Sequence, residues 1–205
     1  MKKYYIYYDI AMPYYDGEKV SSAEDFVRFF DEDPAADIEL HVNSYGGEIA
    51  QALAMLAAME RHTGRIVAYI DGIAASCASW LALAADEVHI ARNAEIFIHR
   101  ASVYMYGNAE DLKKEAVLLE SYDERIIGIY KSKAKDEGTD FAAMMRGETT
   151  LTAGEAAKVW NITVDEVQNV PANRTRYNKV AEKCRNKPSE TGTASDTDDD
   201  IDTII

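Results

Sequence analysis

The chain has 205 residues, of which 47% are hydrophobic, and its 36 acidic residues outnumber 22 basic ones, giving a formal net charge of -14. This length suits one domain with a sizeable core and is too short for two full ones. Because phosphate backbones repel an acidic protein, nucleic acid is not expected as a partner. The most apolar run, Ile73 to Ala85, is shorter than the roughly 20 residues that span a bilayer, so no membrane partner is expected.

The first residues of the chain and its cysteines indicate in which cellular compartment the protein is expected. The first ten residues contain two lysines but no apolar segment, so no signal peptide is expected. Two cysteines, Cys77 and Cys184, argue against a disulfide framework and fit a reducing environment. We therefore expect a soluble cytoplasmic protein.

The charge is concentrated at the end of the chain. Residues 188–205 carry six acidic residues and no basic one, which leaves a net charge of -8 on residues 1–187. With few apolar groups to offset the entropy of ordering, this segment is expected to be disordered. It is interpreted as a solvated extension, with a docking peptide ending in Ile204 and Ile205 as the alternative. We predict one domain, 1–187, followed by a disordered acidic tail, 188–205.

Strands and helices alternate along the predicted domain, as periodicity, caps and turn residues indicate. The predicted strands cover Lys3–Ile10, Ile38–Val42, Arg65–Ile70, Val88–Ala91, Glu95–His99 and Val164–Val167. The predicted helices cover Ala23–Phe30, Glu48–Arg61, Ala75–Ala85 and about Ala109–Lys133, with a short helix starting at the capping box of Thr152 and Glu155. Strands separated by helices of crossover length predict an α/β fold with largely parallel pairing.

The helix over 109–133 is longer than a domain of this size needs for its own core. At about 1.5 Å per residue it would measure roughly 37 Å. Part of it is therefore expected to project.

Three segments carry residues suited to chemistry. Asn43-Ser44-Tyr45-Gly46-Gly47 follows a predicted strand, and paired glycines permit positive φ and close approach of another backbone. Ser76 lies at a predicted helix start, where free N–H groups can stabilise an oxyanion. His99 ends an alternating strand. Taken singly, these are a tight turn, an N-cap and a surface histidine.

The combination of the three segments is more informative. A nucleophilic serine needs a base within hydrogen-bond reach and an oxyanion site beside it. Because the three segments end separate strands of one parallel sheet, they are expected to converge on one edge. His41, His62 and His89 compete with His99 for the role of base.

The joint pattern resembles the ClpP-type serine peptidases of the ClpP/crotonase superfold over roughly residues 4–165. NSYGG is similar to the family's N-S-P-G-G, GIAASCAS to its G-x-A-A-S-M/A-A/G-S, and EIFIH to its strand ending in I-H. The resemblance implies a spiral of βαβ units with a projecting handle helix that builds rings of subunits. It also implies a serine endopeptidase that uses no cofactor, metal or ATP.

The resemblance also implies the roles of individual residues. Ser76 would be the nucleophile and His99 the general base, with the Gly47 and Cys77 amides as the oxyanion hole. The substrate peptide would add as a strand beside Tyr45 and Gly46.

The third member of the triad comes from a separate motif. Glu148 takes the position of the family's triad acid, because Glu148 to Ala156 matches D-x-x-F/L-S-A-x-E-A. The alternative is a solvated loop acid beside a Ser-His dyad.

Within this superfold the chain resembles the head maturation (prohead) proteases of phages and prophages, which implies capsid or scaffold proteins as substrates. The tyrosine-rich first strand, the segment from Glu148 and residues 107–112 carry this likeness. Tyr45 replaces the usual proline and Arg100-Ala101 the usual Gln-Pro, departures that concern the substrate-binding rim. The alternatives are a proteolytic subunit of an ATP-dependent Clp protease, a crotonase-type acyl-CoA enzyme and a catalytically silent assembly protein.

Overall fold

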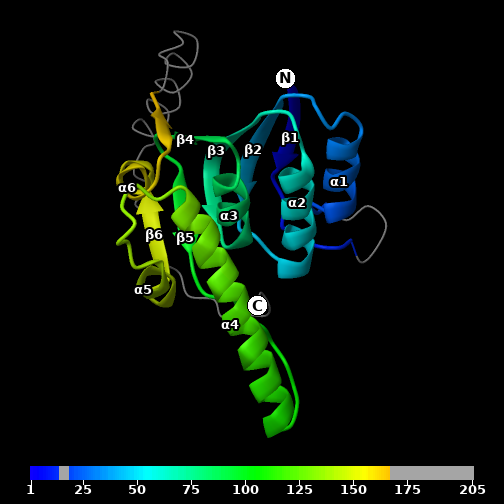
Figure 1. Ribbon diagram of the computed structural model, residues 1–205, viewed down its shortest axis with the longest axis vertical. Coiled ribbons are helices and arrows are strands. Elements are labelled where there is room, and N and C mark those ends of the chain that lie inside the picture. The colour runs from blue at the N-terminus through cyan, green and yellow to red at the C-terminus, as the bar shows by residue number, and fades with distance from the viewer. Residues whose placement is uncertain (14–18, 167–205) are drawn as a thin grey trace, which may run out of the picture. The chain divides into compact units, whose positions relative to one another are not determined.

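The computed structural model describes residues 1–13 and 19–166 of the chain (Figure 1). Its strands are β1 (Lys2–Ile6), β2 (Ile38–Ser44), β3 (Ile66–Ala75), β4 (Glu87–Ala91), β5 (Glu95–Ile98), β6 (Thr149–Thr152) and β7 (Thr163–Asp165). Its helices are α1 (Ala23–Asp31), α2 (Ile49–Arg61), α3 (Cys77–Leu83), α4 (Ala109–Ser132), α5 (Phe141–Arg146) and α6 (Ala153–Val159). The predicted acidic tail, 188–205, and the predicted domain end at residue 187 lie outside the described residues.

The strands form one sheet of largely parallel pairing. Its main path runs β1-β2-β3-β4-β7, with every neighbour parallel. Strand β3 is long enough to pair with two strands along the edge opposite β2, since residues 67–70 pair with β4 and residues 73–75 pair with β5. Strand β6 then adds antiparallel to β5. The predicted α/β class with parallel pairing is confirmed.

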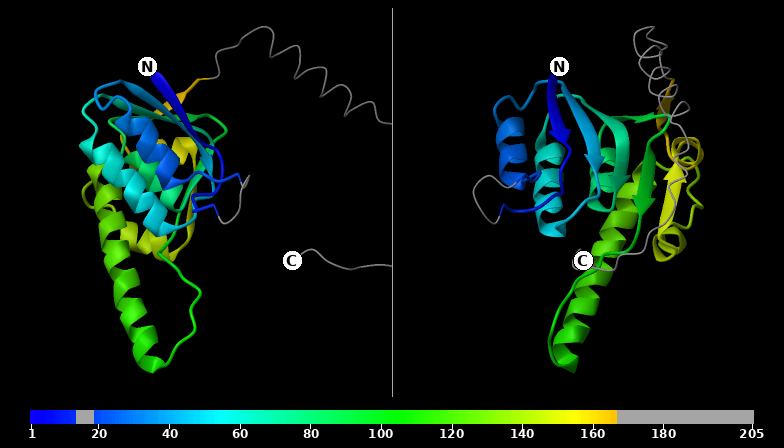
Figure 2. Two further views of the ribbon diagram at one scale, coloured as in Figure 1. Left: turned by 90° about the vertical axis from the view of Figure 1, so that its right-hand side faces the viewer. Right: turned by 180° about the vertical axis from the view of Figure 1, so that it is seen from behind.

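Helices α1, α2 and α3 lie against one face of this sheet (Figure 2). The alternation of each strand explains this, because every second side chain points into the core. Leu40 and Val42 of β2 are fully buried, and they belong to the same core as Phe26 of α1 and Met55 of α2. The face opposite the helices carries Tyr5, His41, Tyr69 and His89, whose rings stack in a row across four strands at 4.9 to 5.2 Å.

Some predicted boundaries were wrong around the end of β3. The strand continues past Ile70 to Ala75, so helix α3 begins at Cys77 instead of Ala75. Pairing with β5 satisfies the backbone of Ile73, Ala74 and Ala75, which explains why small residues that favour a helix are held extended. Strand β1 likewise ends at Ile6, and Ile10 makes isolated parallel bridges to Ser21 and Gly47.

Helix α4 matches its predicted range closely and projects from the body. It starts with a capping box between Asn108 and Asp111. Its buried residues, Asp123, Ile126 and Tyr130, all lie in its second half. Figure 1 shows the first half extending beyond the sheet and the other helices.

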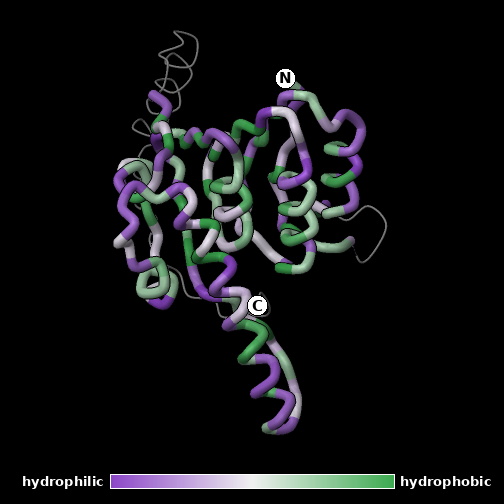
Figure 3. Tube along the Cα trace, viewed as in Figure 1, coloured by the Kyte–Doolittle hydropathy of each residue, from purple (hydrophilic) through white to green (hydrophobic). Residues whose placement is uncertain are grey.

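The projecting end carries exposed apolar side chains. Figure 3 shows apolar residues between hydrophilic ones along this part of the trace. The exposed large apolar residues of this region are Val103, Tyr104, Met105, Tyr106, Leu112, Val117 and Leu118. We call this set the handle patch. Apolar surface of this extent marks an interaction site more often than an ordinary solvated surface.

Among the described helices, none combines the length and the apolar character needed to cross a membrane.

Candidate active site

The three segments singled out in the sequence meet at one edge of the sheet. Strand β2 leads into Gly46 and Gly47, β3 into Ser76, and β5 into His99. Because β3 is parallel to both β2 and β5, all three strands end at the same side. The structure therefore brings the glycine pair, the serine and the histidine together.

Ser76 occupies a strained turn between β3 and α3. Its φ of 52° and ψ of -128° lie outside the regions that a residue with a side chain normally adopts. Its N–H still pairs with the sheet, donating to the Phe97 carbonyl at 2.9 Å, while the next residue already starts α3. Such strain persists only where the surroundings enforce it and concentrates at functional sites.

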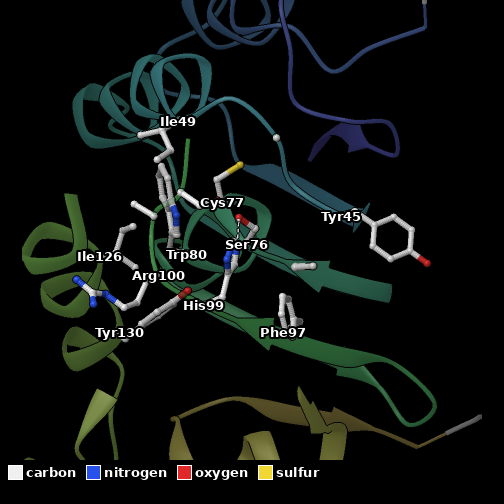
Figure 4. Close-up of a pocket in the computed structure, with 14 residues that line it drawn as sticks. Tyr45, Ile49, Ser76, Cys77, Trp80, Phe97, His99, Arg100, Ile126 and Tyr130 are labelled. Atoms are coloured by element: carbon white, nitrogen blue, oxygen red, sulfur yellow. Dashed lines mark hydrogen bonds between the residues drawn. The ribbon is translucent and has the colours of Figure 1, made fainter. Parts of the chain in front are cut away.

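His99 contacts Ser76 directly. Its Nε2 lies 2.7 Å from the Ser76 Oγ, and its ring stacks on Phe97 at 5.4 Å (Figure 4). In the described part of the chain, Nδ1 of His99 has no hydrogen-bond partner. The two residues thus form the contact that a general base needs to accept the serine proton.

Gly46 and Gly47 adopt backbone conformations that favour glycine, with φ of 94° and 145°. A Cβ on Gly46 would lie 2.7 Å from the Ala75 carbonyl oxygen and 2.8 Å from the Ser76 Cβ, so only glycine allows this approach. Ile10 donates to the Gly46 carbonyl and accepts from the Glu48 N–H, both at 2.7 Å. Since strand groups alternate in direction, the N–H of Gly47 points away from Ile10.

Cys77 lies beside the same glycine. Burial raises the pKa of its thiol to about 12, although the nearby backbone N–H groups of Gly47, Cys77 and Ala78 act to lower it. The thiol is therefore protonated at neutral pH and only 1% of the residue is exposed. The backbone N–H of Cys77 is the first of helix α3, where the helix dipole favours negative charge.

Glu148 directly precedes β6, and His99 directly follows β5. Ile98 and Thr149 are partners in the antiparallel pair of β5 and β6, so His99 and Glu148 each lie one residue beyond that pair. Glu148 has a φ of 48° and an exposed side chain. The described hydrogen bonds include none between its carboxylate and His99.

A cavity of about 320 Å³ opens beside Ser76 and His99 (Figure 4). Its walls include the apolar side chains of Ile49, Trp80, Phe97, Ile126 and Tyr130. Tyr45 lies at its edge with 73% of its surface exposed, pointing away from Ser76 in Figure 4.

Sequence reasoning missed a polar cluster behind the site. Asp123 of α4 accepts hydrogen bonds from Arg100 and from the main chain of Ala101. Tyr130 contacts Ser79, which donates to the carbonyl of Ser76. One feature of the sequence could have revealed this cluster. Asp123 lies three residues before Ile126, so its carboxylate is on the face of α4 that packs against the rest of the domain.

The fold agrees with the comparison to known proteins. Residues 18–169 match the Clp protease family, and the chain belongs to that family.

Curated relatives include two subunits from Streptomyces. The chain is 36% identical over 86 residues to the ATP-dependent Clp protease proteolytic subunit 3 of Streptomyces avermitilis and, equally, to subunit 1 of Streptomyces coelicolor. Each alignment covers 41% of this chain and 39% of the relative. The chain thus spans about two fifths of the length of these relatives.

Proposed function

We propose that this protein is a serine endopeptidase that cleaves peptide bonds without ATP. The observation that carries the proposal is the 2.7 Å contact between Ser76 Oγ and His99 Nε2 at the mouth of a cavity. Membership of the Clp protease family supports it. The N–H groups of Gly47 and Cys77 would bind the oxyanion, and Glu148 would orient His99 as the third member of a triad.

The chemistry would follow from these positions. Nε2 of His99 takes the proton from Ser76 Oγ as the oxygen attacks the peptide carbonyl carbon. The carbonyl oxygen gains negative charge, which the N–H donors stabilise. His99 returns the proton to the leaving amine, and the C–N bond breaks to leave an acyl-serine. Water, deprotonated by His99, then hydrolyses this ester and restores Ser76.

The substrate would lie along the free edge of Gly46 and Gly47. One edge of this segment already pairs with Ile10, so an added peptide strand would use the edge that bears the Gly47 N–H. Tyr45 would contact the peptide at the rim. Because the cavity walls next to Ser76 are mainly apolar, we expect a large aliphatic or aromatic side chain before the cleaved bond.

A second copy of this chain would cover the handle patch. In the described part of the chain, the buried residues of α4 all lie in its second half, and a ring of subunits would remove the apolar side chains of its projecting half from water. We expect the assembled enzyme to act in the cytoplasm, with no nucleic acid or membrane as partner.

We infer capsid or scaffold proteins of a phage or prophage as the natural substrates, as for a head maturation (prohead) protease. The tyrosine-rich β1 and the segment that begins at Glu148 support this inference. Its test is incubation with the capsid and scaffold proteins encoded beside the gene. Trimming that requires Ser76 is expected, and intact proteins would contradict the inference.

A second candidate is the proteolytic subunit of an ATP-dependent Clp protease, because the matching Streptomyces relatives carry that name. It would need a separate unfoldase to degrade folded proteins. A crotonase-type acyl-CoA enzyme has no need of the Ser76 and His99 contact, and a silent assembly protein would not need it either.

Peptide cleavage without nucleotide distinguishes these candidates. The full chain is incubated with a mixture of unfolded peptides, and the products are identified by mass spectrometry. We expect cuts after large apolar residues that disappear in Ser76→Ala. Cuts that require an added unfoldase and ATP would favour the second candidate, and no Ser76-dependent cut under either condition would contradict a peptidase.

A further inference from the structure

Helix α4 buries a carboxylate against the body of the protein. Asp123 is 7% exposed and shares the buried face of α4 with Ile126 and Tyr130. Burying a charged side chain is costly unless it is paired and hydrogen-bonded. The partners of Asp123 therefore indicate what it holds in place.

Both partners of Asp123 directly follow His99 in the chain. Oδ1 accepts the main-chain N–H of Ala101 at 2.8 Å, and Oδ2 accepts Nε of Arg100 at 2.6 Å. The hydrogen bond from Arg100 to Asp123 raises the pKa of the guanidinium further. After β5 ends at Ile98, no strand holds residues 99–101, so these two bonds fix the chain where His99 leaves the sheet.

The contacts of Asp123 are the first arm by which α4 holds the site. A second arm, made by Tyr130 and Ser79, reaches the main chain of Ser76. Ser79 Oγ donates its one proton to the Ser76 carbonyl at 2.6 Å. The Tyr130 hydroxyl, 2.7 Å from that Oγ, is then the donor of the pair. Burial raises the pKa of Tyr130, so its hydroxyl keeps the proton that it donates.

The two arms lie two helical turns apart on one face of α4. A seven-residue separation places Asp123 and Tyr130 on the same side of the helix. One rigid element thus holds the chain after His99 and, through Ser79, the strained turn of Ser76. Together with the pairing of β3 and β5, the relative position of these two points sets the distance between His99 Nε2 and Ser76 Oγ.

We propose that Asp123 and Tyr130 are positioning residues that hold His99 and Ser76 in contact, an inference that rests on the peptidase function proposed above. Neither residue needs to touch the peptide bond. Catalysis depends steeply on such alignment, because a displacement of about 1 Å can cost roughly a hundredfold in rate.

Variants at position 123 test the first arm. Asp123→Ala removes both acceptors, whereas Asp123→Asn keeps one oxygen for the Ala101 N–H. We expect Asp123→Ala to lower kcat for a peptide by about tenfold or more, with KM changed by less than about threefold. Asp123→Asn should recover part of kcat. Glu124→Ala, which removes an exposed carboxylate from the same turn, should leave both constants unchanged.

Variants at positions 130 and 79 test the second arm. Tyr130→Phe keeps the ring in the cavity wall and removes only the hydroxyl, so kcat should fall about fivefold while KM stays constant. Ser79→Ala should have a similar effect. Because the two hydroxyls form one chain, the double variant should lose little more than Ser79→Ala alone. Independent, additive losses would contradict a single arm.

A crystal structure of Asp123→Ala, or of Asp123→Asn if the alanine variant does not fold, separates this proposal from the peptidase proposal. In the alanine variant we expect the distance between His99 Nε2 and Ser76 Oγ to exceed about 3.5 Å, beyond hydrogen-bond reach. In the asparagine variant we expect it to lengthen less. A distance unchanged from the wild type would overturn the positioning role, whatever the activity. An inactive wild type whose distance still depends on Asp123 would contradict the peptidase function alone.

Discussion

His99 and Glu148 each lie one residue beyond the pair of Ile98 and Thr149, where β5 ends and β6 begins. His99 binds Ser76 through Nε2, and its Nδ1 has no partner in the described part of the chain. A carboxylate at Nδ1 would fix the tautomer and stabilise the protonated ring. Glu148, whose side chain is exposed, is the acid that we propose for this role.

Glu148→Ala is therefore expected to lower kcat for a peptide by about tenfold or more, and Glu148→Gln by a similar factor. Steady-state kinetics with a small peptide measure the effect. Glu137→Ala, which removes another exposed acid, serves as the control. A loss below twofold in both Glu148 variants would leave a Ser-His dyad as the working unit.

Cys77 should resist thiol reagents in the folded protein. Its pKa is raised to about 12 by burial, so the reactive thiolate is scarce at pH 8, and the residue is 1% exposed. Iodoacetamide treatment followed by digestion and mass spectrometry should find Cys77 unmodified until the protein is unfolded. Rapid alkylation of Cys77 in the native protein would contradict the buried position of the thiol.

The handle patch should be required for self-association. Val117 is 66% exposed near the projecting end of α4, and a charge at this position would be costly to bury between subunits. Val117→Glu is expected to shift native mass toward smaller species without loss of helix content. Lys113→Gln, also exposed on α4, should assemble as the wild type does. An unchanged assembly in Val117→Glu would exclude this surface as the interface.

His89 should make stability depend on pH. Burial lowers the pKa of His89, but the carboxylates of Asp165 and Glu87, at 2.7 and 2.8 Å, raise it more, so the net shift is upward. A raised folded pKa stabilises the protein fully below the ordinary value of about 6.5, and this contribution is lost as pH rises through the folded pKa.

His89→Gln is therefore expected to lower the free energy of unfolding by roughly 0.5 kcal/mol at pH 6, since the carboxylates are partly exposed to solvent. The difference from the wild type should shrink by pH 9. Urea unfolding at several pH values measures it. A difference that grows with pH would show that His89 is not protonated in the folded protein.

The sequence predicted those residues of the site that follow the end of a strand. The local patterns are a glycine pair, a serine between small residues and a histidine after an alternating strand. Because the strands are parallel, their ends lie at the same edge of the sheet. Strand β6 and helix α5 were not predicted, because β6 has four residues and gains its stability from pairing with β5. The contacts of Asp123 with residues 100 and 101 also depend on the packing of α4, which periodicity alone does not determine.

The position of Glu148 shows a related limit. Its motif suggested a triad acid, and the register of β6 places it one residue beyond the partner of Ile98. The direction of its side chain depends on a backbone with a φ of 48°, which sequence patterns do not reveal.

Labelling with a fluorophosphonate probe tests whether Ser76 is an activated nucleophile, because the probe reacts with a serine that a base activates. The wild type, Ser76→Ala and His99→Ala are treated alike, and the modified residue is located by mass spectrometry. We expect one adduct on Ser76 in the wild type and none at that position in either variant. An assembled, folded wild type without an adduct on Ser76 would contradict the proposed serine peptidase function.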